Sequence, residues 1–190
     1  MKKQKGLKGF VLLALGLLAV NVGGQFVFHR FDLTADQRYT LSDSTKKILN
    51  EVTEPVFIDV YLEGNFPAEF RKLQTESKQL LEEFSAYNTN VNFLFVNPIA
   101  NEKDAPQVAE MLFANGMKPI NISVNDKGKQ SQEMVFPWAV ATKGEQHAKI
   151  QLLKNVMGAS TEDKITSSVQ HLEYAITEAI DKEKKKKSKK

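Results

Sequence analysis

The stretch EGNFPAEF, residues 63–70, combines polar side chains with the glycine and proline that shape tight backbone turns. It follows an apolar segment and precedes a long amphipathic one, so we expect it to connect a strand to a helix. One interpretation is a loop that grips a ligand or partner through Glu63, Gly64, Asn65 and Pro67. The other is a simple turn entering the helix, which is the commoner role of such a segment.

Chemistry at this loop is restricted by the residues that the chain lacks. Redox activity of the thioredoxin type needs a thiolate at the start of a helix, and the sequence contains no cysteine. The same absence excludes disulfides and cysteine-ligated zinc. His29, His147 and His171 are widely separated and have no helical i, i+3 or i, i+4 partner among themselves. We therefore expect no metal and no cofactor.

Nucleotide-binding and hydrolase motifs are also missing from the sequence. It has neither a phosphate-binding G-x-x-x-x-G-K-[ST] nor a dinucleotide-binding G-x-G-x-x-G. A nucleophile elbow, G-x-S-x-G, is not present either. These observations predict a protein that is not an enzyme and that acts through binding.

Charge is distributed unevenly along the 190 residues, although the net charge of the whole chain is only +3. The four lysines of residues 1–8 contribute +4, and the lysine-rich tail 182–190 contributes +6. Residues 9–181 therefore carry a net charge of −7. Because nucleic-acid binding needs a basic face on the folded body, nucleic acid is not an expected partner.

Residues 9–28, GFVLLALGLLAVNVGGQFVF, contain no charged side chain. Twenty helical residues rise about 30 Å, which matches the hydrocarbon thickness of a bilayer. Because lysines precede this run, the positive-inside tendency predicts a cytoplasmic basic N-terminus, residues 1–8, and an exported remainder. A cleaved signal peptide is the alternative, but the run is long for one and no A-x-A-like site follows it. We expect a single-pass protein of the cell inner membrane with a periplasmic main domain.

The segment after this run predicts a juxtamembrane connector and a short capped helix, residues 29–49. Ser42 is placed to cap that helix, and Asp43 lies in its first turn. The apolar run Val56–Leu62 and the segment 91–98 are both typical of strands buried on two faces. Between them, residues 68–88 predict a long amphipathic helix, giving a β-α-β unit.

The second half of the chain completes an α/β domain. Residues 105–115 predict a helix, and 120–124 and 132–141 predict two strands around an NDKG turn. Pro137 marks the second of these as an edge or bulged strand, and residues 145–154 are a candidate for one further short strand. A final helix, capped by Ser160, extends to about Ile180.

The order β-α-β-α-β-β-α over residues 50–181 predicts a thioredoxin-like α/β domain, followed by a disordered tail at 182–190. Pro119, in KPI, lies where such domains carry a proline before the third strand. A ligand pocket, if the domain has one, is therefore expected near Gly64–Pro67 and Pro119.

Three segments in order resemble the N-terminal part of the GldG family: RFDLTADQRYTLSDSTKKIL, VYLEGNFPAEFRKL, and the VNP that ends the second strand. This family comprises auxiliary components, often called substrate-binding, of the gliding-motility ABC transporter of Bacteroidota. The resemblance covers residues 7–181 and implies a permease subunit and a separate ATPase subunit as partners. It also implies that full members continue into a second domain and a closing membrane span. It supplies no catalytic residues.

The sequence thus predicts a non-enzymatic, membrane-anchored auxiliary subunit of an ABC transporter complex, working through protein–protein contacts. A periplasmic ligand-binding module with a pocket at the 63–67 loop is the alternative. The candidate partner contacts lie in the connector and at the start of the first domain helix: Arg30, Asp32, Arg38, Tyr39, Thr40 and Ser42.

Overall fold

The computed structural model describes Gly16, residues 40–126 and residues 129–187. The chain divides into two units, residues 1–38 and 39–190. The expected basic segment, the expected span apart from Gly16, and the candidate contacts Arg30, Asp32, Arg38 and Tyr39 lie outside the described residues. Within the described stretches, no helix combines the length and the apolar character needed to cross a membrane.

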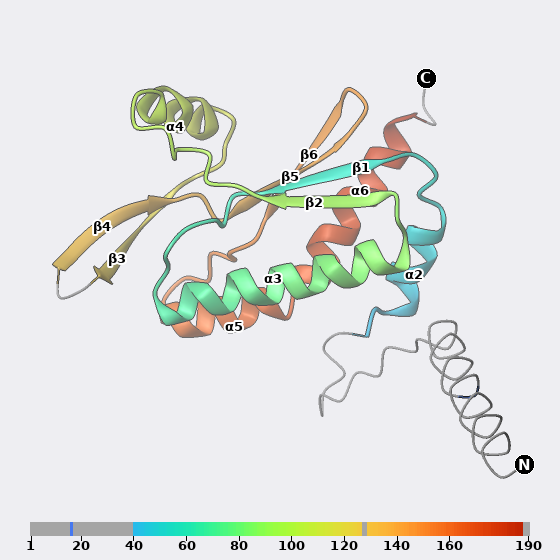
Figure 1. Ribbon diagram of the computed structural model, residues 1–190, viewed down its shortest axis with the longest axis horizontal. Coiled ribbons are helices and arrows are strands. Elements are labelled where there is room, and N and C mark those ends of the chain that lie inside the picture. Colours follow the sequence, from blue (N-terminus) through green and yellow to red (C-terminus); the bar gives the residue numbers. More distant parts are fainter. Residues whose placement is uncertain (1–15, 17–39, 127–128, 188–190) are drawn as a thin grey trace, which may run out of the picture. The chain divides into compact units, whose positions relative to one another are not determined.

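The second unit is a mixed α/β domain (Figure 1). Its elements in chain order are α2 (Asp43–Asn50), β1 (Val56–Val60), α3 (Ala68–Tyr87), β2 (Val91–Phe95), α4 (Ala105–Ala114), β3 (Ile120–Asp126), β4 (Lys129–Val135), β5 (Trp138–Lys143), β6 (Gln146–Gln151), α5 (Thr161–Val169) and α6 (Leu172–Lys187).

The main sheet has four strands in the order β2-β1-β5-β6. β1 and β2 are parallel, as the β-α-β pattern predicted, with Ile58 opposite Phe93. β5 runs antiparallel to β1, and β6 runs antiparallel to β5. β3 and β4 form a separate two-stranded antiparallel hairpin, which Figure 1 shows standing away from the main sheet.

The predicted strand 132–141 is divided in two, and its halves belong to different sheets. β4 ends at Val135 and β5 begins at Trp138, with Pro137 between them. Proline has no N–H to donate to a sheet ladder, and here the Trp138 N–H bonds back to the Phe136 carbonyl at 2.8 Å. The chain therefore turns at Pro137 and leaves the hairpin to enter the main sheet. Within residues 145–154, which were suggested as a further strand, Gln146–Gln151 form β6, the fourth strand of the main sheet.

The elements that the structure describes cover only one face of the main sheet along its length, so the prediction of strands buried on both faces is wrong. Phe57 of β1 is 55% exposed and Leu94 of β2 is 61% exposed. Both side chains point away from the face on which α3 and α6 pack, because their neighbours Ile58 and Phe93 point toward it. The other face is covered by α4 at one end only.

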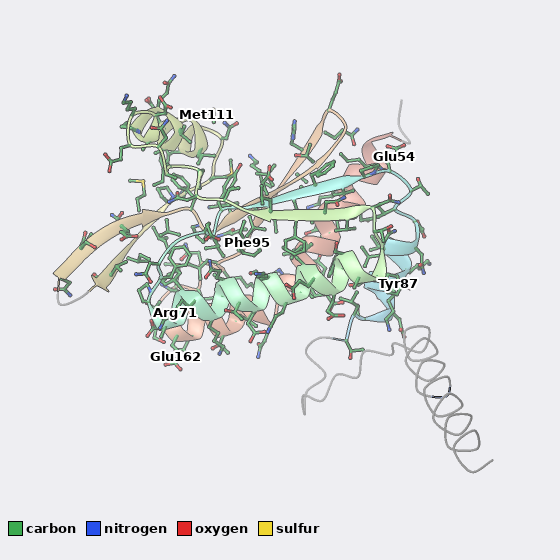
Figure 2. All side chains as sticks on the ribbon, in the orientation of Figure 1. Glu54, Arg71, Tyr87, Phe95, Met111 and Glu162 are labelled. Carbon is green, nitrogen blue, oxygen red and sulfur yellow. The ribbon has the colours of Figure 1, made fainter. Side chains whose placement is uncertain are left out.

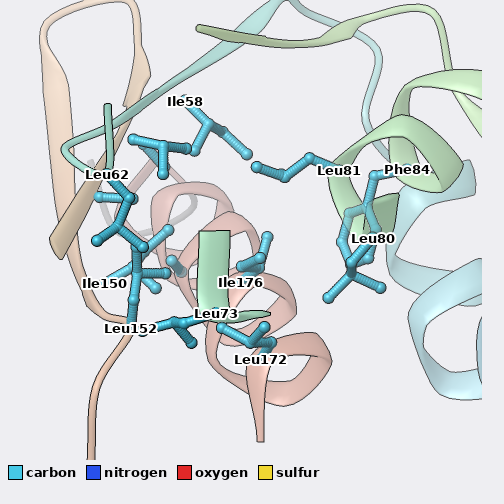
Figure 3. Packing of buried hydrophobic residues seen from close by; sticks show 14 of the residues in the cluster. Ile58, Leu62, Leu73, Leu80, Leu81, Phe84, Ile150, Leu152, Leu172 and Ile176 are labelled. Atoms are coloured by element: carbon cyan, nitrogen blue, oxygen red, sulfur yellow. The ribbon is translucent and has the colours of Figure 1, made fainter. Parts of the chain in front are cut away.

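The main core lies between the sheet and the helices α3 and α6 (Figure 3). Alternate residues of β1 point into it, which follows from the two-residue period of a strand. The largest side chains of this core that are fully buried are Phe84, Leu49, Ile58, Leu62, Leu73, Leu81, Ile150, Leu152, Ile165, Leu172 and Ile176. A smaller second cluster, Leu112, Met117 and Phe136, lies beneath α4.

The expected C-terminal helix is broken into α5 and α6 between Val169 and Leu172. The cap at its start is confirmed, because Ser160 Oγ accepts a hydrogen bond from the Asp163 amide at 3.1 Å. α6 runs on to Lys187, into the lysine-rich segment 182–190.

Candidate functional site

The loop at residues 63–67 leaves the carboxyl end of β1 and leads into α3. Leu62, just before it, is fully buried, and its carbonyl accepts a hydrogen bond from Gln74 Nε2 of α3 at 2.8 Å. The amide of Tyr61 donates to the Trp138 carbonyl of β5 at 2.8 Å. The start of the loop is therefore fixed both to the sheet and to the helix that follows.

Gly64 lets the chain fold back over the ring of Phe66. Its φ is +154°, which lies in a region that residues with a Cβ rarely adopt. A Cβ at this position would lie 3.3 Å from two carbon atoms of the Phe66 ring. Phe66 is only 4% exposed, so the glycine allows this ring to close the base of the loop.

Pro67 occupies the N-cap position of α3 and supplies no side-chain cap. Its carbonyl accepts the Arg71 amide at 2.9 Å, which starts the helical ladder. No side chain among the described residues therefore caps the first-turn amides of α3. These amides, at the positive end of the helix dipole, lie next to the loop.

A small hollow lies on one side of the loop, where the carboxyl ends of β1 and β2 meet. Its volume is about 30 Å³, which is room for a single water molecule. Its lining residues are Tyr61, Glu63, Gly64, Phe66, Asn97, Pro98, Ile99, Glu133, Met134, Val135 and Phe136. Burial first, and the nearby Asp59 carboxylate second, raise the pKa of the Tyr61 hydroxyl above its usual value.

A larger open cleft lies on the other side, between the start of α3, strand β3 and the start of α5. Its volume is about 490 Å³, within the range of small-molecule sites. Glu69 and Lys164 bring opposite charges to its wall, and Thr161 adds a hydroxyl. Its remaining lining residues are Pro67, Phe70, Ile120, Asn121, Ile122, Ser123 and Leu153.

The structure brings together part of the loop that the sequence singled out. Glu63 and Gly64 line the small hollow, whereas Pro67 lines the larger cleft. Asn65 is exposed and lines neither. Pro119 is half-buried and lines neither cavity, although the next residue, Ile120, lines the larger cleft.

Several lining residues were missed by the sequence analysis. Asn97 and Pro98 were interpreted only as the end of a strand, and Ile99 was not considered, although parallel strands place their carboxyl ends at one edge, where ligands commonly bind. That signal was available in the sequence. The sequence contains no comparable indication that Glu133 and Lys164 line the cavities, because their positions depend on how the β3–β4 hairpin and α5 pack on the rest of the domain.

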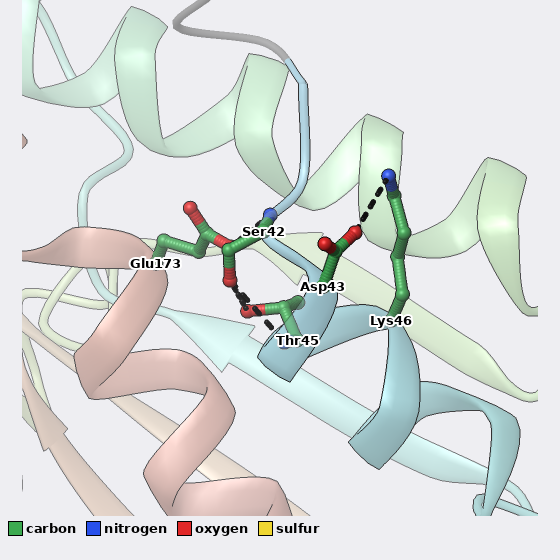
Figure 4. Close-up of polar contacts among 5 residues, drawn as sticks. All are labelled: Ser42, Asp43, Thr45, Lys46 and Glu173. Atoms are coloured by element: carbon green, nitrogen blue, oxygen red, sulfur yellow. Dashed lines mark hydrogen bonds and ion pairs between the residues drawn. The ribbon is translucent and has the colours of Figure 1, made fainter.

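Ser42, a candidate partner contact, is engaged within the domain (Figure 4). Its Oγ accepts the Thr45 amide at 3.2 Å, and its own amide donates to Glu173 Oε1 of α6 at 2.8 Å. Thr45 Oγ1 lies 3.0 Å from Thr177 Oγ1, also on α6. The predicted cap is therefore confirmed, and it joins α2 to α6. Thr40 is exposed at the edge of the described residues.

The histidines of the domain lie away from both cavities. No histidine lines either cavity. His147 instead lies 3.0 Å from Thr142 Oγ1 on the open face of the sheet, and the ring of His171 packs on Tyr174. Across the part of the chain that the structure describes, no group of three His, Asp or Glu side chains is placed to hold a metal ion. A cleft with opposite charges and apolar walls suits binding.

The fold and this site together define a mixed α/β domain built on a four-stranded mixed sheet with an added hairpin. The chain belongs to the family described as a domain of unknown function, DUF7088, whose sequence profile matches residues 35–142, more than half of its length. Comparisons with curated proteins and with solved structures found no match.

Proposed function

We propose that this protein is a non-enzymatic, membrane-anchored auxiliary subunit of a gliding-motility-type ABC transporter complex, related to GldG. In this proposal its partners are a permease subunit, a separate ATPase subunit and the lipid of the inner membrane. The domain lies in the periplasm and acts through protein–protein contacts. The resemblance of residues 7–181 supports this assignment, and so does the absence of catalytic motifs from the sequence.

The observation that carries the proposal is the attachment of α2 to α6. Ser42 and Thr45 are bonded to Glu173 and Thr177, so the first helix is held to the domain at its start. Only residues 29–41 separate Ser42 from the uncharged segment 9–28. Thirteen residues reach at most about 47 Å when fully extended. An anchor in the uncharged segment would therefore keep the domain close to the membrane.

The finer description of the fold as thioredoxin-like is part of the same proposal. The order β2-β1-β5-β6, with only β2 parallel to β1, supports it, and β3–β4 is then an insertion before the third strand of the sheet. In that arrangement Pro137, which directly precedes β5, takes the place that the sequence analysis gave to Pro119. No redox activity follows, because the chain has no cysteine.

Membrane fractionation and co-purification test this function. The full chain is expected to sediment with membranes, to need detergent for release, and to bring down a permease and an ATPase. Replacing Arg30, Asp32 and Arg38 by alanine is expected to keep membrane attachment and lose the partners. The matched control replaces Arg71, Lys72 and Glu82, which are exposed on α3, by alanine. It removes the same number of positive and negative charges. A soluble mature protein lacking about its first thirty residues would contradict the proposal.

The larger cleft favours a second candidate, a periplasmic ligand-binding module. Its volume of about 490 Å³ and the Glu69 and Lys164 side chains are suited to a small polar ligand. A small molecule that raises the Tm of the full chain, and no longer does so in Lys164→Ala, would support this candidate. Lys118→Ala, an exposed lysine that does not line the cleft, is the control.

A further inference from the structure

The outer edge of β2 has backbone groups with no partner among the described residues. β2 lies at the end of the sheet and pairs with β1 alone (Figure 1). The Val56 amide donates to the Asn90 carbonyl at 2.8 Å, and the Val96 amide donates to the Val60 carbonyl at 2.9 Å. In a parallel ladder, alternate residues of a strand bond to the same neighbour. These two bonds therefore show that the even-numbered residues of β2 bond to β1. Odd-numbered residues therefore direct their N–H and C=O groups outward.

The first of these outward residues is already satisfied. The Val91 amide donates to the Asn88 carbonyl at 3.0 Å, and the Val91 carbonyl accepts from Ser85 Oγ at 2.6 Å. Phe93 and Phe95 follow, and their outward amides and carbonyls have no partner within the domain that the structure describes. They form a short, open edge of four hydrogen-bonding groups.

Charged residues and prolines, which commonly protect sheet edges, are absent from β2. The strand itself, VNFLF, contains no charged residue and no proline, and no charge occurs from Asn88 to Asn101. Natural proteins normally place lysines, prolines or bulges on such edges to prevent another strand from adding. An uncharged edge of this kind matches a second copy of itself, because like charges do not meet across the pairing.

We propose that β2 pairs antiparallel with β2 of a second copy of this chain, about a two-fold axis at Leu94. In this register Phe93 of each copy is opposite Phe95 of the other, and each such pair exchanges both of its backbone hydrogen bonds. All four free groups of each edge are then used. A two-fold axis at Phe93 instead would require Val91, whose amide and carbonyl are already bonded.

The side chains agree with this register. Leu94, 61% exposed in the single chain, faces its own symmetry mate as a non-hydrogen-bonded pair, where Cβ atoms lie about 4.5–5.5 Å apart. On the opposite face, the half-buried rings of Phe93 and Phe95, already 6.2 Å apart in an edge-on arrangement, meet the same two rings of the partner. Figure 2 labels Phe95 in this part of the sheet. The product is one continuous eight-stranded sheet.

Cysteine cross-linking tests the pairing directly, because the chain has no native cysteine. Leu94→Cys in the full chain is expected to give a disulfide-linked species of twice the 21.4 kDa monomer mass under mild oxidation. Asn92→Cys is the matched control, since Asn92 is exposed on the same strand and the same face. In the proposed register it lies four residues from its own mate, so it should cross-link at least about tenfold more slowly.

A charge at the axis gives a second readout. Leu94→Lys places two like charges opposite each other and is expected to give monomers in sedimentation at concentrations where the unmodified chain dimerises. Tyr174→Lys, 60% exposed on α6, should dimerise normally. Equal cross-linking at positions 92 and 94, a chain that is monomeric throughout, or cross-linking of Leu94→Cys to another protein only, each overturns the proposal. None of these results depends on a transporter partner.

Discussion

At the scale of single residues, Ser42 is the most connected polar group at the start of the domain. It caps α2 by accepting a hydrogen bond from the Thr45 amide. The hydroxyl of Thr45, a residue only 2% exposed, is in turn hydrogen-bonded to the hydroxyl of Thr177 on α6. Buried hydroxyl groups without such partners would reduce stability. The network therefore fixes the position of α2 on the domain as well as its first turn.

Ser42→Ala is expected to lower the free energy of unfolding by about 1 kcal/mol, because the cap bond to the Thr45 amide is lost. Urea denaturation of the full chain measures this change. Ser44→Ala, an exposed serine in the same helix, should change stability by less than about 0.5 kcal/mol. Equal effects of the two substitutions would show that the cap contributes nothing.

Caps were predictable from sequence because they depend on a few neighbouring residues. Ser42 and Ser160 both precede a helix with an acidic residue in its first turn, and both accept the expected amide bond. Exposure was not predictable in the same way. Phe57 and Leu94 belong to apolar runs, and only the placement of distant helices decides which of their faces remains open.

At the scale of elements, α3 and α5 each bury a serine, but the two hydroxyl groups differ in their hydrogen bonding. Ser77 of α3 is fully buried, and its Oγ has no hydrogen-bond partner among the described residues. Ser168 of α5 is 1% exposed, but its Oγ donates to the Lys164 carbonyl at 2.5 Å and accepts the Lys154 amide at 2.8 Å. The same side chain thus has opposite energetic consequences in the two helices.

Ser77→Ala is expected to raise the free energy of unfolding by about 1 kcal/mol, since it removes an unsatisfied hydroxyl and improves helix propensity. Ser168→Ala is expected to lower it by about 1–3 kcal/mol, because the Lys154 amide loses its acceptor. Thermal or urea unfolding of both variants makes the comparison. A loss of stability in Ser77→Ala comparable to that in Ser168→Ala would contradict this account.

The elements themselves were largely predictable, but their pairing was not. The helix at 68–88 and the parallel β1–β2 unit follow from local periodicity and short connections. The separation of β4 from β5 depends on Pro137 together with the partners that each half finds: β4 pairs with β3, and β5 pairs with β1. Proline marked the position of the break, but it did not indicate which sheet each half would join. The 63–67 loop was predicted, whereas the walls that face it come from elements distant in sequence.

At the scale of the whole molecule, the core is completed by the C-terminal third of the chain. β6 and α6 contribute Ile150, Leu172 and Ile176, all of which are fully buried or nearly so. The family match ends at residue 142, within β5 and before all three. The matched region is therefore shorter than the unit that buries the core.

A fragment of residues 35–142 is expected to lack a cooperative melting transition, because it leaves the α6 side of the core exposed to water. A fragment of residues 40–182 should melt cooperatively, since it retains every buried residue of the main core. Circular dichroism during heating distinguishes the two. Cooperative melting of the shorter fragment would mean that β6, α5 and α6 are dispensable for folding.

The link between Thr45 and Thr177 also has a consequence for biosynthesis. These residues are 132 positions apart, so the ribosome needs roughly 7–26 s after making the first to make the second. Throughout that interval α2 lacks the helix that fixes it, and for the later part of it the uncharged strand Val91–Phe95 is already present in the nascent chain. Newly made chains are therefore most exposed to aggregation, and most in need of chaperones, until the last helix emerges.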